Sequence, residues 1–123
     1  MAAHWMEFEG KRIFYVDLAG FKTNEQALED ELDRTIGNIG TGWENTPLGT
    51  ALVLVDLRDT NITRGVQRRI MERIAVTQKY IRKTAVVGLS GLRRVFLDLF
   101  ARSAAVQTVG FDDPEAAKKW LVK

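Results

Sequence analysis

Two short and almost purely apolar runs restrict the fold of this chain more than any other feature of its sequence. They are ALVLVD at 51–56 and AVVGL at 85–89, and each is followed by a stretch of helical pattern. Unbroken apolar runs of this length are typical of strands covered on both faces, as in parallel sheets flanked by helices. The sequence therefore predicts an α/β fold with these two runs as central strands.

Residues 1–50 are predicted to add a hairpin and a helix. Alternating apolar residues at 5–8 and 13–16 indicate two strands joined by a turn at 9–11. Thr23 or Asn24 can cap a helix. The apolar positions of this helix, at helical spacing, are Leu28, Leu32, Ile36 and Ile39. The glycine-rich stretch 37–50, which contains Trp43, is predicted to be a loop.

The rest of the chain alternates helices and strands. A helix predicted at 63–81 has an apolar stripe and an opposite basic face; the stripe is Val66, Ile70, Ile74, Thr77 and Ile81, and the basic face is Arg64, Arg68, Lys79, Arg82 and Lys83. The next helix follows Ser90 and carries Leu92, Val95, Phe96, Leu99 and Phe100. A strand at 106–111 precedes a last helix, started by Asp113-Pro114 and carrying Ala116, Ala117, Trp120 and Leu121. This order predicts one domain, residues 1–123, with a single mixed, mostly parallel sheet of four to five strands and packed helices.

Composition excludes several kinds of site. The 123 residues include no cysteine, and this excludes disulfides, thiolate metal sites and cysteine nucleophiles. The sequence has one histidine, His4. The acidic residues of the predicted first helix are spread over its outward face, so no metal site and no cofactor is predicted. No segment reaches the roughly 18 apolar residues of a membrane span, and residues 1–12 lack the apolar core of a signal peptide. We therefore expect a cytoplasmic protein without a membrane span.

Charge is distributed unevenly along the chain. The net charge is only +2, but residues 1–57 carry −6 and residues 58–102 carry +8. The basic segment favours an acidic protein partner or an anionic group. Nucleic acid is disfavoured, because few aromatic side chains are interleaved with the basic residues of 64–83 and Glu72 interrupts them.

The turn that follows the first central strand is the main candidate site. In open α/β sheets, ligands and partners bind where the carboxyl end of a strand meets a helix N-terminus. The polar residues expected to converge there are Asp56, Asp59, Thr60, Asn61 and Thr63, with Arg64 and Arg68 at the start of the basic helix. A purely structural explanation competes with this one, since Asn61 or Thr63 can simply cap the helix while Asp56 ends the strand.

The turn after the second central strand is the other candidate. The backbone around Gly88, Ser90 and Gly91 could meet an anion at the following helix, although Ser90 can equally act as a plain helix cap. The turn is neither a P-loop nor a nucleophile elbow, because Leu92 stands where the elbow needs its last glycine. Acyl-transfer chemistry is therefore not predicted.

Four stretches of sequence carry a family resemblance: VDLAGF at 16–21, LVLVDLRDTNIT at 52–63, AVVGLSGLRRVFLDLF at 85–100 and VGFDDPEAAKKWLV at 109–122. Together they resemble the SpoIIAA-like group of STAS-type domains, also described as STAS/SEC14 domain proteins. The resemblance implies a sheet of four or five strands with packed helices. Related anti-sigma-factor antagonists carry a phosphorylatable serine in a D-S-S-G-like turn. The corresponding turn here, 59–65, offers Thr60 and Thr63 but no such serine pair, so no phosphorylation switch is predicted.

Two functions follow as hypotheses. The first is a non-enzymatic STAS-like binding or regulatory module for a protein partner or a small anionic or apolar ligand, such as a lipid. The alternative is a small α/β enzyme or ligand-binding domain that acts on an anionic substrate at the two strand-to-helix turns. The sequence leaves the identity of the partner and the oligomeric state open.

Overall fold

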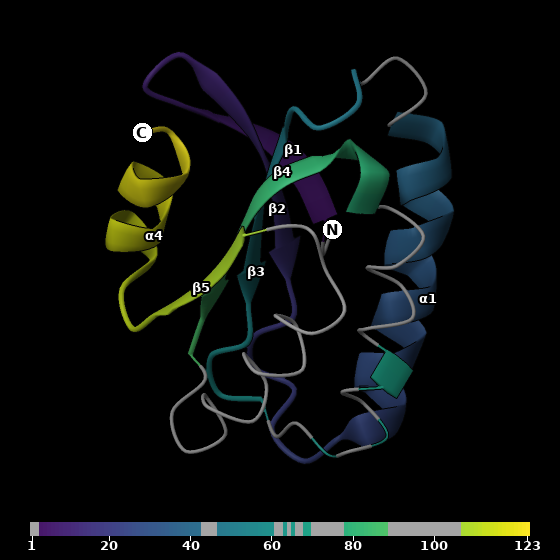
Figure 1. The fold of residues 1–123 in the computed structure, drawn as a ribbon. Helices are drawn as coiled ribbons and strands as arrows, with labels where there is room; N and C mark the ends of the chain where they lie inside the picture. Colours follow the sequence, from purple (N-terminus) through teal and green to yellow (C-terminus); the bar gives the residue numbers. More distant parts are fainter. Residues whose placement is uncertain are drawn as a thin grey trace.

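A five-stranded sheet forms the centre of the protein (Figure 1). The computed structural model describes residues 3–42, 47–60, 63, 65, 68–69, 78–88 and 107–123. The strands, adjacent in chain order, are β1 (Ala3–Phe8), β2 (Lys11–Asp17), β3 (Ala51–Asp56), β4 (Ile81–Val87) and β5 (Gln107–Phe111). β1 pairs antiparallel with β2 and the other pairs are parallel, which confirms the predicted single mixed, mostly parallel sheet.

The hairpin of β1 and β2 turns through two residues, Glu9 and Gly10. Both have positive φ, 51° and 81°, which is the backbone of a type I′ turn. This turn twists in the same sense as the flanking strands, so it joins them without splaying them. The predicted turn also included Lys11, but Lys11 begins β2 and pairs with Phe8.

The helices α1 (Glu25–Gly42) and α4 (Pro114–Leu121) lie on opposite faces of the sheet (Figure 1). Leu28 of α1 packs with one set of strand side chains, whereas Ala117 and Leu121 of α4 pack with the other set. β3 contributes side chains to both sets, because Val53 faces α1 and Leu54 faces α4. All six residues of β3 are buried, as its unbroken apolar sequence predicts.

α1 begins as predicted but ends later. The Asn24 side chain caps it, accepting a hydrogen bond from the Ala27 amide at 3.1 Å. The helix continues to Gly42, so the prediction of a loop over 37–50 is wrong for 37–42. Each helical glycine costs roughly 1 kcal/mol relative to alanine, but a helix that has already nucleated gains one hydrogen bond per added residue. Trp43 lies outside the described residues.

The predicted helix at 63–81 is too long at its C-terminal end. Gly65, Arg68 and Arg69 have helical backbone, but Gln78–Tyr80 is a 3-10 turn (η1) and Ile81 is the first residue of β4. Ile81 is buried in the sheet, and an apolar residue at the end of a helical pattern satisfies a strand equally well. Arg82 and Lys83 therefore belong to β4 and not to a helical basic face.

The ends of the last elements follow the sequence closely. β4 stops at Val87 instead of Leu89, because Gly88 adopts a φ of +89°. α4 starts with Asp113 as its cap, whose side chain accepts from the Glu115 amide, and with Pro114 in the first turn, as predicted. Leu89 and the helix predicted to carry Phe96 lie outside the described residues.

Candidate functional site at the carboxyl edge of the sheet

The four parallel strands end level with one another. Asp17 of β2 is in register with Asp56 of β3, which is in register with Val87 of β4. Backbone hydrogen bonds then continue from turn to turn beyond the strands: Leu18 N to Asp56 O at 2.9 Å, Leu57 N to Val87 O at 2.9 Å, and Gly88 N to Phe111 O at 3.1 Å. The segments that follow the strands at this edge are therefore hydrogen-bonded to each other, and Gly88, the first residue of the second candidate turn, lies beside the turn at 56–63.

Asp56 is the centre of this edge. It is 1% exposed, and both of its carboxylate oxygens accept hydrogen bonds. Oδ1 accepts from the Arg58 backbone amide at 3.1 Å and from its Nε at 3.0 Å. Oδ2 accepts from Arg58 Nη2 at 2.7 Å and from the Tyr15 hydroxyl at 2.7 Å. A buried charge requires this degree of pairing, so the carboxylate acts first as an anchor for the turn.

The network shifts the acidities of its members. Burial alone raises the pKa of Asp56, but the hydrogen bonds from Arg58 and Tyr15 outweigh it and hold the pKa below the ordinary 3.8. The hydrogen bond to Asp56 raises the pKa of Arg58. Burial, together with the hydrogen bond and the charge of Asp56, raises the pKa of Tyr15 to about 12. Near neutral pH the network therefore holds an anion, a cation and a neutral phenol.

The raised pKa of Tyr15 predicts a loss of folding stability at alkaline pH. The Tyr15 pKa is about 12 in the folded protein against 10.0 ordinarily, so deprotonation is easier in the unfolded chain. This contribution to stability is complete below pH 10 and is lost as the pH rises through 12. Chemical unfolding at a series of pH values should show that loss, and Tyr15→Phe should reduce it. Equal alkaline losses in the two proteins would contradict the prediction.

Thr60 joins the turn to the segment after β2. Its hydroxyl donates to the Leu18 carbonyl at 2.6 Å and accepts from the Phe21 amide at 3.2 Å. Lys22 and Thr60 also form an isolated parallel bridge. Farther on, the Thr63 hydroxyl donates to Glu25 Oε1 at 2.8 Å, which connects the turn to the first turn of α1. The hydroxyl groups of both threonines thus link the turn to neighbouring segments of the chain.

The structure places some of the predicted site residues and not others. Asp56, Asp59, Thr60 and Thr63 lie along one turn, and Gly88 packs against it. Arg68 has helical backbone and is exposed. The other four predicted site residues lie outside the described residues: Asn61, Arg64, Ser90 and Gly91.

Gly88 lies in close contact with the backbone of Arg58 in the turn at 56–63. A Cβ built on it would lie 2.7 Å from both the Arg58 amide nitrogen and the Arg58 Cγ, and 2.8 Å from its Cα. Its φ of +89° is also one that residues with a side chain rarely adopt. Glycine is therefore needed here for packing between the turns, whatever the site binds.

Two features of the site go beyond the sequence prediction. Among the five strands that the structure describes, strand order follows chain order, so these strands form no point of reversed order where a ligand crevice would open. The sequence analysis also missed Tyr15 and Arg58, which provide the polar partners of Asp56. One signal was available: Tyr15 and Asp17 are two residues apart, so they lie on one face of a predicted strand, and both are polar at the end of that strand.

The described residues contain neither a metal-binding cluster nor a membrane-spanning helix. No group of three or more His, Asp or Glu side chains within these ranges could hold a metal ion. Among the same residues, no helix is both long and apolar enough to span a bilayer.

Comparison with known proteins identifies the fold. No protein-family model and no curated protein matches the sequence. A solved structure, an uncharacterized protein of the DUF3478 family from Shewanella loihica PV-4, superposes with a TM-score of 0.73 at 12% sequence identity. The match covers 98% of this chain and 92% of that chain, and that protein is described as having a SpoIIAA-like fold. The chain therefore has a SpoIIAA-like α/β fold.

Proposed function

We propose that this chain is a non-enzymatic binding or regulatory module of STAS type, and that its partner contacts the turn at 56–63 together with Arg64 and Arg68. One observation carries the proposal: Asp56, Thr60 and Thr63 each use their polar atoms to hold the turn against another element. A turn that is fixed in this way loses little conformational entropy on binding, which favours recognition by shape and charge.

Charge supports an acidic partner. Arg58 keeps half of its side chain exposed while its guanidinium holds Asp56, and Arg68 and Lys22 are also exposed. Two exposed acids lie at the turn, Asp59 and Glu25, which accepts from Thr63, whereas by sequence the segment 58–102 carries +8. Exposed cations such as Lys22, Arg58 and Arg68 attract acidic groups over about 8 Å at physiological ionic strength. The cytoplasmic location stays a prediction from the sequence.

Binding of a glutamate-rich peptide to the full chain tests this proposal. We expect anisotropy titrations to show binding that weakens with salt, and the double substitution Arg64→Gln and Arg68→Gln to reduce it about tenfold. The double substitution Lys119→Gln and Lys123→Gln removes the same two charges from exposed positions near the C-terminus, and it should have little effect. An equal loss with this control would show that only net charge matters and would contradict a site at this turn.

Phosphorylation of the turn is not expected. The Thr60 hydroxyl is held between the Leu18 carbonyl and the Phe21 amide, and the Thr63 hydroxyl donates to the Glu25 carboxylate. A phosphate on Thr63 would face that carboxylate and be repelled by it. After incubation with cell lysate and ATP, the intact mass should be unchanged. A stoichiometric phosphate on Thr60 or Thr63 would instead support a phosphorylation-regulated antagonist.

A further inference from the structure

Arg58 presents a second donor edge beside its contact with Asp56. One edge of its guanidinium is used: Nε lies 3.0 Å from Asp56 Oδ1 and Nη2 lies 2.7 Å from Asp56 Oδ2. A guanidinium carries further N–H groups in the same plane, so this contact leaves those at its far end. Within the described residues no hydrogen bond uses Nη1, and half of the side chain is exposed. The far end of Arg58 is therefore accessible to another carboxylate.

The rest of Arg58 is held at several points. Its amide donates to Asp56 Oδ1 at 3.1 Å, and its carbonyl accepts from the Gly20 amide at 2.9 Å. Its Cγ lies against Gly88, where an added Cβ would come within 2.7 Å of it. A side chain that is fixed at its backbone, its stem and one edge of its guanidinium loses little freedom when an anion binds. The donor edge of Arg58 is thus preorganised.

The acid that holds Arg58 is more deeply buried than the acids of the other described arginine ion pairs. The Asp56 side chain is 2% exposed, whereas the acids that pair with Arg34 and Arg69 are 17% and 21% exposed. Ion pairs at the surface contribute little, because water competes for both partners. Asp56 exchanges its partner for water only if the turn opens, so it keeps the Arg58 guanidinium in place.

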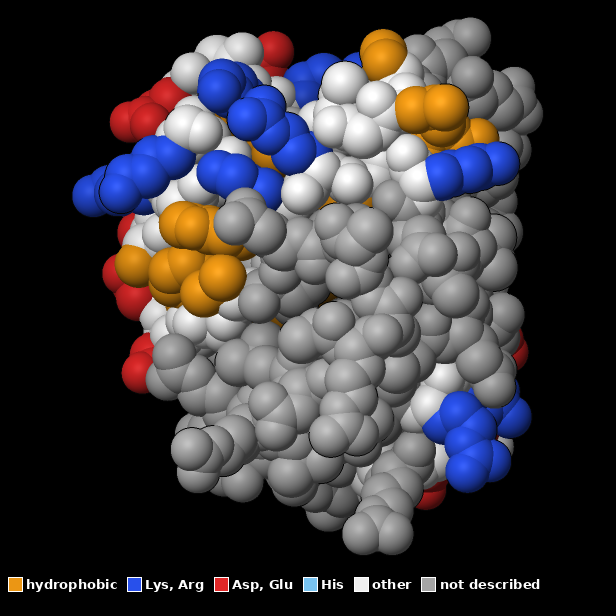
Figure 2. Space-filling model, in the orientation of Figure 1, with side chains coloured by type: hydrophobic (Ala, Val, Ile, Leu, Met, Phe, Trp, Pro, Cys, Tyr) orange, Lys and Arg blue, Asp and Glu red, His pale blue; other side chains and the backbone are white. Residues whose placement is uncertain are grey.

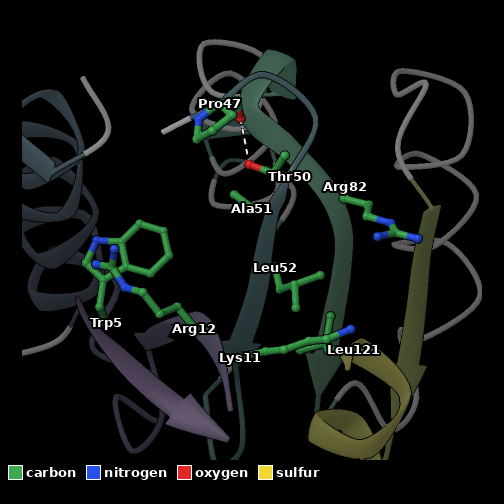
Figure 3. A pocket seen from close by; sticks show the side chains of 9 residues that line it. All are labelled: Trp5, Lys11, Arg12, Pro47, Thr50, Ala51, Leu52, Arg82 and Leu121. Carbon is green, nitrogen blue, oxygen red and sulfur yellow. Dashed lines mark hydrogen bonds between the residues drawn. The ribbon is translucent and has the colours of Figure 1, made fainter. Parts of the chain in front are cut away.

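Other described arginines lack such an anchor. Figure 3 shows the Arg12 side chain lying across Trp5, at 4.4 Å from the ring centre, and Arg82, which forms a bulge in β4, extending outward. Lys and Arg side chains also gather at the lower right of Figure 2, where Figure 1 places the start of α1 and residues 68–69. These cations attract acidic groups, whereas Arg58 offers them a fixed geometry.

We propose that Arg58 is the specificity-determining contact of the binding site at 56–63, and that the end of its guanidinium receives a carboxylate from an acidic protein segment. The inference rests on the proposed function, because it names the group of the partner that the turn recognises. Two parallel N–H···O bonds to one carboxylate match the planar fork, which lysine cannot reproduce. Asp56 offsets much of the Arg58 charge, so the preference comes from geometry, and Asp56 is a positioning residue.

Binding of the glutamate-rich peptide to Arg58→Lys tests the inference. Lysine keeps the positive charge but offers no planar fork, so we expect about tenfold weaker binding, which is about 1.4 kcal/mol. Arg34→Lys is the matched control, since it makes the same replacement at an exposed position on α1. Its affinity should equal that of the unmodified chain. Circular dichroism at the temperature of the titration checks that both variants are folded.

Asp56→Asn separates positioning from charge. The substitution removes a negative charge beside the site, so a partner attracted by charge alone would bind this variant more tightly. If Asp56 positions Arg58, the same variant binds the peptide more weakly, by about fivefold. In the unmodified chain, the nitrogen-15 NMR signal of Arg58 Nε–H should also move when the peptide is added.

The results distinguish this inference from the proposed function. Binding that is unchanged by Arg58→Lys, or that Asp56→Asn tightens, overturns the inference. The proposed function then still stands if the double substitution of Arg64 and Arg68 weakens binding. A loss with Arg34→Lys equal to that with Arg58→Lys also overturns the inference. If the peptide does not bind the unmodified chain, the proposed function itself is contradicted, and this inference with it.

Discussion

Replacing Gly88 by alanine is expected to destabilise the protein by about 3 kcal/mol, through two independent effects. A φ of +89° costs a residue with a side chain roughly 1–2 kcal/mol. The new Cβ would also lie 2.7 Å from the backbone nitrogen of Arg58, and a crowded backbone relaxes less readily than a flexible side chain. Urea unfolding of the variant measures the sum.

Gly20→Ala is the matched control for the Gly88 prediction. Gly20 has nearly the same φ, +82°, but an added Cβ there meets nothing within 4 Å. We therefore expect about 1 kcal/mol of destabilisation from backbone strain alone. The difference between the two variants isolates the close approach of the turns. Equal losses would mean that the turns are not packed as the structure shows.

Much of the fold could be predicted because its signals are local. The run at 51–56 has no polar residue before Asp56, which is the pattern of a strand covered on both faces. Asp113 followed by Pro114 defines a helix start by cap chemistry alone. Both depend on neighbours in sequence, so no tertiary information is needed.

The wrong element boundaries arise where local signals conflict or where pairing between strands decides the structure. Glycines in 37–42 favour a loop, but propagation of an established helix outweighs their cost. Ile81 fits both a helical stripe and a strand, and pairing with Ala51 decides for the strand. The bulge at Arg82 depends on the register between two strands, which the sequence of neither strand specifies alone.

The candidate site was also predictable only where its signals are local in the sequence. The end of a buried strand marked Asp56 as a residue of interest, because ligands and partners bind where a central strand meets a helix. Its partners were missed because Tyr15 is 41 residues away and reaches Asp56 through the pairing of β2 with β3. Arg58 is only two residues away, but its guanidinium could equally have faced solvent. Only tertiary structure identifies which basic residue pairs with the acid.

Asp56→Ala should cost about 3 kcal/mol of stability. Removing one member of a buried ion pair typically costs roughly 3–5 kcal/mol, and the lower value applies because half of the Arg58 side chain is already exposed and can hydrate. The variant also leaves the Tyr15 hydroxyl and the Arg58 amide without their acceptor. Asp56→Asn retains the shape and one acceptor oxygen, so it should lose about half as much.

A double-mutant cycle and a pH series identify the source of the Asp56 effect. Arg58→Ala alone should cost about 1–2 kcal/mol, and the double variant less than the sum of the two single ones, because the pair is lost only once. The pKa of Asp56 lies below 3.8 in the folded protein, so its contribution is present above pH 3.8 and is lost as the pH falls through the folded value. Asp56→Asn should therefore unfold with a shallower acid dependence than the unmodified chain. Strict additivity of Asp56→Ala and Arg58→Ala, with an unchanged acid dependence, would show that the buried pair does not hold the turn.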